Sequence, residues 1–182
     1  IPSWKNAIFN FHTAIDPKVL DLKSPSFIRL AYDEMLAKQL SLAIIRKNIL
    51  KDRGNSYSNK KSQLVIKFTK MLPFKITQNQ SDIINEVIDD LNSSKKMLRL
   101  LHGDVGSGKT VVAITSALHV INSGFQVALM VPTELLAIQH YNQVKQLFDK
   151  LKLKVYLLTS STEKKSEGLK LIASGQVDLV IG

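Results

Sequence analysis

The chain has 182 residues, of which 45% are hydrophobic, contains no cysteine and carries a formal net charge of +10. This length allows one domain, or one domain and part of another, with a buried core, and no run of about 18 apolar residues predicts a membrane span. The absence of cysteine excludes disulfides and thiolate metal sites and favours a reducing compartment, so we expect a cytoplasmic protein.

The positive charge is concentrated in the first segment, residues 1–72. This segment holds 13 Lys or Arg and 5 Asp or Glu, whereas residues 73–182 hold 12 and 10. The net charge is therefore +8 in the first segment and +2 in the second. The excess favours a polyanionic partner for the first segment, although a solvated cationic surface explains it equally well.

A long helix is the main feature predicted in the first segment. Few regular signals occur in residues 1–23, which we interpret as the tail of a preceding domain. Residues 24–26 (Ser-Pro-Ser) then offer an N-terminal cap and a first-turn proline. Helical spacing of apolar residues predicts a helix over residues 27–50, which we interpret as a connector between domains.

Residues 51–61 form a polar, basic stretch whose composition predicts a mobile loop. Within it, Arg53, Lys60 and Lys61 are candidates for neutralising phosphates. Tyr57 is a candidate for stacking on a nucleic-acid base. One aromatic residue in a polar loop is weak evidence, so a plain linker is the simpler interpretation of this stretch.

A second helix is predicted to begin after Thr77. Thr77 and Gln80 have the spacing of a capping box, and apolar residues recur on one helical face up to Leu91. Capping therefore explains Gln80. A functional interpretation is also available, because a glutamine amide can donate to and accept from an adenine ring. The two interpretations stay open at this point.

A glycine-rich stretch between a short apolar run and a helical pattern carries the strongest signal in the chain. Residues 97–101 are predicted to form a buried strand, and residues 111–121 a helix. The stretch between them has the spacing G-x-x-x-x-G-K-[ST] of a phosphate-binding loop. It consists of Gly103, Asp104, Val105, Gly106, Ser107, Gly108, Lys109 and Thr110.

The residue types of this stretch follow from the chemistry of phosphate binding. Glycines let the backbone approach a ligand and point successive N–H groups at phosphate oxygens, beside the positive end of a helix. Lys109 is predicted to reach the β- and γ-phosphates, and the Thr110 hydroxyl to ligate Mg²⁺. A glycine-rich turn without a ligand is the structural alternative to this interpretation.

The rest of the chain alternates between strand and helix patterns. Strands are predicted over residues 126–131, 154–158 and 177–181, and helices from Thr133 to about residue 150 and over residues 163–173. Thr133 is predicted to cap the first of these helices. Short connections between such elements indicate βαβ units with right-handed crossovers. The sequence therefore predicts an α/β fold with a parallel sheet, preceded by a mainly helical connector.

Four stretches resemble motifs of the RecG family of superfamily-two DNA helicases and occur in the order that the family has them. Arg29 to Leu40 resembles the helical connector after the wedge domain, and Leu72 to Gln80 an adenine-reading glutamine motif. Leu100 to Ala113 resembles the phosphate loop of the family, and Ala128 to His140 (Ala-Leu-Met-Val-Pro-Thr-Glu-Leu-Leu-Ala-Ile-Gln-His) its next DNA-contacting motif.

The resemblance implies a RecA-like motor domain that binds ATP and Mg²⁺ and contacts branched or duplex DNA. It assigns ATP binding to residues 103–110 and Gln80, catalytic roles to Lys109 and Thr110, and Mg²⁺ to Thr110. It also assigns DNA contacts to Pro132, Thr133 and Glu134. As in the family, a monomer without membrane contact is expected.

The resemblance also implies domain limits. Residues 1–72 would be the end of the wedge domain and the connector, and residues 73–182 the N-terminal part of the first motor domain. The Asp-Glu-x-His motif and the second motor domain of the family would follow, so the chain alone is expected to be inactive. Ser160 stands where the family usually has glycine, which predicts strain if that position has a positive φ.

Two other functions compete with that of a DNA-translocating ATPase. The chain could bind ATP or DNA as a module without turnover, because the hydrolytic half is missing. It could also belong to a different phosphate-loop enzyme, such as a small kinase, which would need a lid and an acceptor site. Turnover by the chain alone would exclude the first alternative, and nothing after residue 110 indicates the second.

Overall fold

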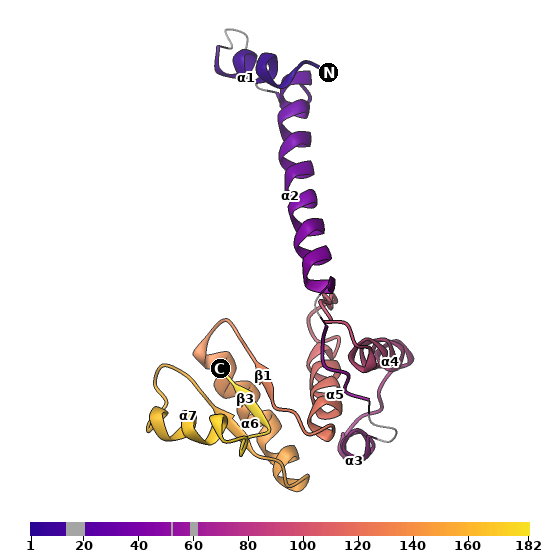
Figure 1. Ribbon diagram of the computed structural model, residues 1–182, viewed down its shortest axis with the longest axis vertical. Helices are drawn as coiled ribbons and strands as arrows, with labels where there is room; N and C mark the ends of the chain where they lie inside the picture. Colours follow the sequence, from indigo (N-terminus) through magenta and orange to yellow (C-terminus); the bar gives the residue numbers. More distant parts are fainter. Residues whose placement is uncertain (14–20, 52, 59–61) are drawn as a thin grey trace. The chain divides into compact units, whose positions relative to one another are not determined.

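The computed structural model describes residues 1–13, 21–51, 53–58 and 62–182. The chain divides into two compact units, Ile1–Asp52 and Arg53–Gly182, each of which is described by itself. The second unit combines helices with a parallel sheet, which confirms the predicted α/β fold class (Figure 1). The division of the chain into residues 1–72 and 73–182 stays a prediction.

The first unit contains helices α1 (Trp4–His12) and α2 (Pro25–Lys51). The sequence did not predict α1, which is only 9 residues long. The Ser3 hydroxyl caps α1 by accepting a hydrogen bond from the Asn6 amide at 3.3 Å. A capping serine and one helical turn of apolar spacing are too little signal to separate a short helix from a loop.

Helix α2 begins where the sequence predicted. The Ser24 hydroxyl accepts a hydrogen bond from the Phe27 amide at 3.2 Å, which confirms the predicted cap. Along the first half of α2, charged side chains one turn apart form ion pairs, which add a few tenths of a kcal/mol each. These pairs are Arg29 with Asp33 at 2.9 Å and Lys38 with Glu34 at 3.0 Å.

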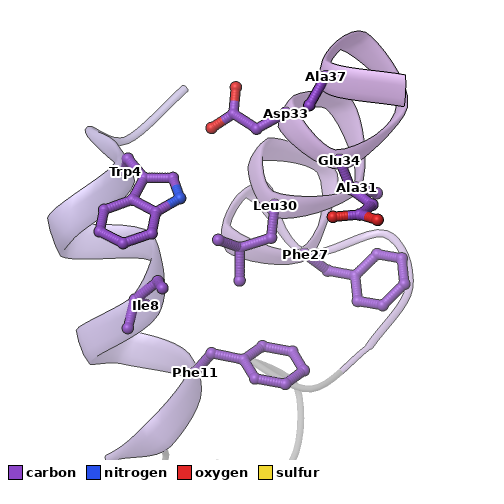
Figure 2. A pocket seen from close by; sticks show the side chains of 9 residues that line it. All are labelled: Trp4, Ile8, Phe11, Phe27, Leu30, Ala31, Asp33, Glu34 and Ala37. Carbon is purple, nitrogen blue, oxygen red and sulfur yellow. The ribbon is translucent and has the colours of Figure 1, made fainter. Parts of the chain in front are cut away.

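Apolar side chains of α1 and α2 face each other across an open groove (Figure 2). Trp4, Ile8 and Phe11 line it from α1, and Phe27 and Leu30 line it from α2. The Phe11 and Phe27 rings lie with their centroids 6.3 Å apart and tilted by 40°. These apolar contacts hold α1 against the start of α2.

The second unit contains a three-stranded parallel sheet. Its strands are β1 (Val127–Leu129), β2 (Val155–Leu157) and β3 (Leu179–Ile181), and β3 lies in the middle. Val127 and Val155 both pair with Leu179, so the three strands begin at one level. The three strands predicted after the phosphate loop are therefore confirmed, each shorter than the apolar run that predicted it.

Among the described residues of this unit, five helices accompany the sheet: α3 (Gln63–Met71), α4 (Gln78–Asn92), α5 (Lys109–Asn122), α6 (Glu134–Lys150) and α7 (Lys165–Ala173). Helix α6 packs on β2 and β3, and α5 packs on α3, α4 and β1 (Figure 1). In the described part of the chain, no helix combines the length and the apolar character needed to cross a membrane.

The core of the second unit lies between the sheet and helices α3, α5 and α6. Its largest fully buried apolar side chains are Phe68 of α3, Leu118 of α5, Phe148 of α6, and Leu179 and Ile181 of β3. Each such side chain contributes about 1.5–3 kcal/mol through burial. The sequence did not predict α3, so the contribution of α3 to the core is a finding of the structure.

The prediction of a buried strand over residues 97–101 is wrong. These residues form no strand, and the side chain of Leu100 is 88% exposed. Arg99 instead forms ion pairs with two acidic residues of α4, Asp90 at 2.6 Å and Glu86 at 2.8 Å. A guanidinium inside a buried strand would lack such partners, so these pairs favour a position beside α4 over one in the sheet.

The prediction of a loop is confirmed for residues 53–58, which belong to no helix and no named strand, but hydrogen bonds fix this loop to the end of α4. The amide of Gly54 donates to the Ser94 carbonyl at 2.8 Å, and the amide of Tyr57 donates to Leu91 at 3.0 Å. The Tyr57 ring packs edge-on against Phe125, with centroids 5.0 Å apart, rather than standing free to stack on a base. Lys60 and Lys61, the proposed phosphate contacts, lie outside the described residues.

His119 is a buried packing residue of α5, with 2% of its surface exposed. Its Nε2 forms a 2.9 Å hydrogen bond with Oδ1 of Asn92 at the end of α4, which requires the tautomer that carries hydrogen on Nε2. Burial of the ring lowers the pKa of His119. The folded protein therefore favours the neutral ring.

We expect His119 to make the protein less stable in mild acid. Its pKa is lower in the folded state than in the unfolded state, so the unfolded chain binds more protons below about pH 6.5. Urea unfolding from pH 7.5 to pH 5 should show a falling free energy of unfolding, with a shallower fall in His119→Gln. Identical pH slopes for both proteins would contradict this assignment.

Candidate functional site

The glycine-rich loop, residues 103–108, leads directly into the first turn of α5. Gly106 and Gly108 have φ angles of +80° and +82°, in the left-handed region that favours glycine. Gly108 is also the residue at which the loop turns into the helix, because it occupies the N-cap position of α5. The loop therefore has the backbone conformation for which its glycines were singled out in the sequence.

The ammonium group of Lys109 lies over this loop. Its Nζ donates hydrogen bonds to the carbonyl oxygens of Gly103 and Asp104, both at 2.6 Å. The amide of Ser107 closes the loop by donating to the Asp104 carbonyl at 3.2 Å. Backbone carbonyl oxygens thus hold Lys109 at the mouth of the loop. A phosphate oxygen carries negative charge and is a stronger hydrogen-bond acceptor for the ammonium group than these neutral carbonyls.

The donors of this loop fit a triphosphate. Among the described residues, the amides of Gly106, Gly108 and Lys109 donate to no protein acceptor. These amides and the positive end of the α5 dipole favour an anion at this place. Thr110 is exposed in the first turn of α5, where its hydroxyl would hold a Mg²⁺ ion bound to such phosphates.

Gln80 connects α4 to the phosphate loop. Its Oε1 accepts from the Thr77 amide at 3.0 Å while the Thr77 hydroxyl accepts from the Gln80 amide at 3.3 Å, which confirms the capping box. Its Nε2 donates to the carbonyl of Ser107 at 2.9 Å. The sequence suggested a contact of this amide with a ligand but did not reveal its contact with the loop.

Pro132 and Thr133 are exposed and lie between β1 and α6, and Glu134 is the first residue of α6. The Thr133 hydroxyl accepts a hydrogen bond from the Leu136 amide at 3.3 Å and thereby caps α6. Capping explains why a threonine stands here. It leaves the hydroxyl hydrogen of Thr133 as a donor for a second group.

Glu134 is bound by three hydroxyl groups, a contact that the sequence did not predict. Its carboxylate accepts from Thr159 at 2.9 Å, from Ser160 at 3.0 Å and from Ser161. The hydrogen bonds from Ser161, Thr159 and Ser160, in that order, lower the pKa of Glu134. The hydroxyl run after β2 is the signal in the sequence by which these residues could have been found.

The expected strain at Ser160 does not occur. In the described part of the chain, the residues other than glycine with positive φ are Lys152 and Lys164. Ser160 therefore adopts an ordinary backbone conformation, and its hydroxyl gains Glu134 as a partner. A serine is accommodated at this position without the conformational freedom of glycine.

The two loops beyond β1 and β2 meet at one edge of the sheet. Because the strands are parallel, residues 130–134 and residues 158–162 both follow the carboxyl ends of their strands. Ligands of open α/β sheets bind at this edge. The hydroxyl of Thr133 and the N-terminal turn of α6 can hold a phosphate there without reading bases.

Most of the second unit matches a known protein family. Residues 77–182 match the family model described as DEAD/DEAH box helicase. This range contains the phosphate loop, Gln80 and the loop at residues 130–134.

Individual relatives are similar over most of the chain. It is 42% identical over 183 residues to the ATP-dependent DNA helicase RecG of Thermotoga maritima, covering 98% of this chain and 23% of the relative. It is 40% identical over 156 residues to RecG of Synechocystis sp., covering 85% of this chain and 19% of the relative. The chain therefore spans about a quarter or less of the length of these relatives.

A solved structure is similar as well. The structure of RecG bound to a three-way DNA junction matches with a TM-score of 0.76 and 40% sequence identity. The match covers 98% of this chain and 24% of the chain in that structure.

Replacement of Gly108 tests whether Gln80 and the phosphate loop form one site. A Cβ at Gly108 would collide with Nε2 of Gln80 and would also sit on a backbone with φ of +82°. We expect Gly108→Ala to raise the dissociation constant for a fluorescent ATP analogue at least about tenfold, because it displaces both the loop and Gln80.

Gly124→Ala is the matched control. Gly124 has a φ of +84°, but a Cβ there would meet nothing within 4 Å. This variant should lose about 1–2 kcal/mol of stability through backbone strain and keep its nucleotide affinity. Equal nucleotide affinities in the two variants would show that the contact between Gly108 and Gln80 has no part in binding.

Proposed function

Because the chain belongs to the DEAD/DEAH box helicase family, we propose that it is the ATP-binding part of a RecG-type DNA helicase that acts on branched DNA in recombination and repair. Replication forks and Holliday junctions are the proposed substrates. The observation that carries the proposal is the phosphate loop, residues 103–110, joined to Gln80 by a hydrogen bond to Ser107.

In this proposal the backbone amides of residues 103–110 bind the phosphates of ATP. Lys109 exchanges the carbonyls of Gly103 and Asp104 for the γ-phosphate, where its charge stabilises the phosphoryl group in transfer. The Thr110 hydroxyl holds Mg²⁺, which neutralises phosphate charge when bound. A lysine that is already placed at the loop mouth needs only a small movement to take this role.

Gln80 is the proposed contact to adenine. Its capping bond and its bond to Ser107 use one lone pair of Oε1 and one hydrogen of Nε2. The amide keeps a second lone pair and a second hydrogen, which adenine can satisfy with its exocyclic amine and a ring nitrogen. Gln80 would then connect the adenine base, through its hydrogen bond to Ser107, with the loop that binds the phosphates.

The proposed DNA-binding site consists of Pro132, Thr133 and Glu134, of which Glu134 has a supporting part. The Thr133 hydroxyl and the amides of the first turn of α6 contact the phosphate backbone, so binding is independent of sequence. Glu134 carries a negative charge, and its hydroxyl partners at residues 159–161 hold that charge in place. Its proposed part is therefore to order the two loops rather than to touch phosphate.

Hydrolysis and movement along DNA are proposals for the whole protein. Closure of two motor domains on ATP, and their opening after hydrolysis, would move duplex DNA past a wedge. We propose that the protein acts as a monomer in the cytoplasm, where chromosomal junctions arise. Similarity to RecG, including the structure of RecG bound to a three-way DNA junction, supports this assignment.

Replacement of Lys109 tests the proposed ATPase. In the native protein that contains this chain, Lys109→Ala should lower the ATPase rate stimulated by branched DNA roughly a hundredfold or more, because it removes the charge that faces the γ-phosphate. Lys150→Ala removes an equal charge from the exposed end of α6 and serves as control. An ATPase rate that branched DNA does not change would refute the proposed function.

Two replacements of Thr133 separate capping from DNA binding. Both serine and aspartate can cap α6, but aspartate places a negative charge where a DNA phosphate is proposed. We expect Thr133→Ser to keep the affinity for a branched DNA and Thr133→Asp to lower it about tenfold at low salt, with similar thermal stability. Unchanged affinity in Thr133→Asp would remove Thr133 from the DNA contact.

A further inference from the structure

A short segment outside the phosphate loop joins the far ends of the two helices that carry the candidate site. Residues 53–57, here called the clasp, run antiparallel to the chain that leaves α4, with a bridge between Arg53 and Lys95. The Ser56 hydroxyl donates to the carbonyl of Asn92, the last residue of α4, at 2.6 Å. The clasp thus binds the C-terminal end of α4.

The clasp is also hydrogen-bonded to the C-terminal end of α5. The hydroxyl of Ser123, the residue after α5, lies 2.8 Å from the Tyr57 carbonyl and 3.2 Å from the carbonyl of His119, and donates its one hydrogen to the nearer of them. The Tyr57 ring packs edge-on against Phe125. One clasp residue, Tyr57, therefore joins both helix ends, because its amide also donates to Leu91 of α4.

The backbone of the clasp lies close to the backbone of the chain that leaves α4. A Cβ at Gly54 would lie 2.9 Å from the carbonyl carbon and oxygen of Lys95 and from the amide nitrogen of Lys96. Real Cβ atoms do not come this near to backbone atoms, so a side chain at residue 54 would push the clasp away. Glycine is required here for space and not for an unusual φ angle.

The same two helices are joined at their other ends by the candidate site itself. There, Nε2 of Gln80 at the start of α4 donates to the carbonyl of Ser107, just before α5. Beside the clasp, the His119–Asn92 hydrogen bond also connects the C-terminal ends of the two helices. The 14 residues of α5 place the clasp about 20 Å from the phosphate loop.

We propose that the clasp is a positioning element for the nucleotide site, with Ser56, Tyr57 and Ser123 as its positioning residues. By fixing the C-terminal ends of α4 and α5 to each other, it fixes how their N-terminal ends meet. Those ends carry Gln80 and the phosphate loop, so loss of the clasp lets Gln80 separate from the loop. The inference rests on the proposed function, because the positioned site is the proposed ATP site.

The clasp acts on binding of the nucleotide and not on the chemical step. Lys109 and Thr110 sit on α5 itself and keep their place relative to the loop when α4 shifts. Gln80 belongs to α4, so its position relative to the loop changes when α4 shifts. Disruption of the clasp should therefore raise the KM for ATP and leave kcat nearly unchanged, a division that general loss of folded protein cannot produce.

The test uses Ser56 because its side chain is exposed and its replacement leaves the core intact. In the native protein that contains this chain, with saturating branched DNA, Ser56→Ala should raise the KM for ATP about threefold and the double variant Ser56→Ala with Ser123→Ala about fivefold or more. The kcat should change less than twofold. Ser56→Thr keeps the hydroxyl and should restore the original KM.

Ser174→Ala is the matched control. Ser174 follows α7 as Ser123 follows α5, and its hydroxyl donates to the Leu171 carbonyl at 3.0 Å, but it touches no part of the clasp. This variant should keep the original KM. Thermal unfolding of each variant shows that the protein measured is folded.

Two results would overturn the inference, and they are distinguishable. If the unchanged protein hydrolyses ATP and the folded clasp variants have its KM, the clasp has no positioning role while the proposed function stands. A fall in kcat at constant KM would likewise show that the clasp has no role in positioning the nucleotide site. If the unchanged protein neither binds nor hydrolyses ATP, the proposed function and the clasp's role fail together.

Discussion

The hydrogen bond from Nε2 of Gln80 to the Ser107 carbonyl is the contact on which the candidate site depends. It joins two features that the sequence keeps 27 residues apart, the start of α4 and the phosphate loop. The same side chain caps α4, so helix formation fixes the amide in the orientation that reaches the loop. Gly108 contributes by leaving room for that amide, because a Cβ would occupy its place.

The rest of the second unit keeps this contact in register. Leu118 of α5 lies in a core shared with Phe68 of α3 and Phe148 of α6, which holds the phosphate-loop helix against its neighbours. Residues 53–57 hold the far ends of α4 and α5 together. The loops after β1 and β2 form a second group at the sheet edge, where Glu134 and its hydroxyl partners bring residues 130–134 and 158–162 into contact.

Local signals in the sequence were sufficient for the parts of the site that are built locally. The glycine loop, the capping box at Thr77 and Gln80, and the cap at Thr133 each follow from residues a few positions apart, and the structure has all three as predicted. The parallel strands followed from apolar runs with short connections. No pattern of local spacing predicts Arg99 pairing with Asp90 and Glu86, or Glu134 with residues 159–161, because these contacts depend on tertiary packing. The apolar run at residues 97–101 was misread for that reason.

Hydrogen–deuterium exchange of the native protein with and without Mg·ADP tests the joined site most directly. If Gln80 and the phosphate loop act as one site, ADP slows amide exchange both in residues 103–111 and at the start of α4, around residues 78–84, at the same ligand concentration. Slower exchange in the loop alone, with the start of α4 unchanged at saturating ADP, would contradict the account.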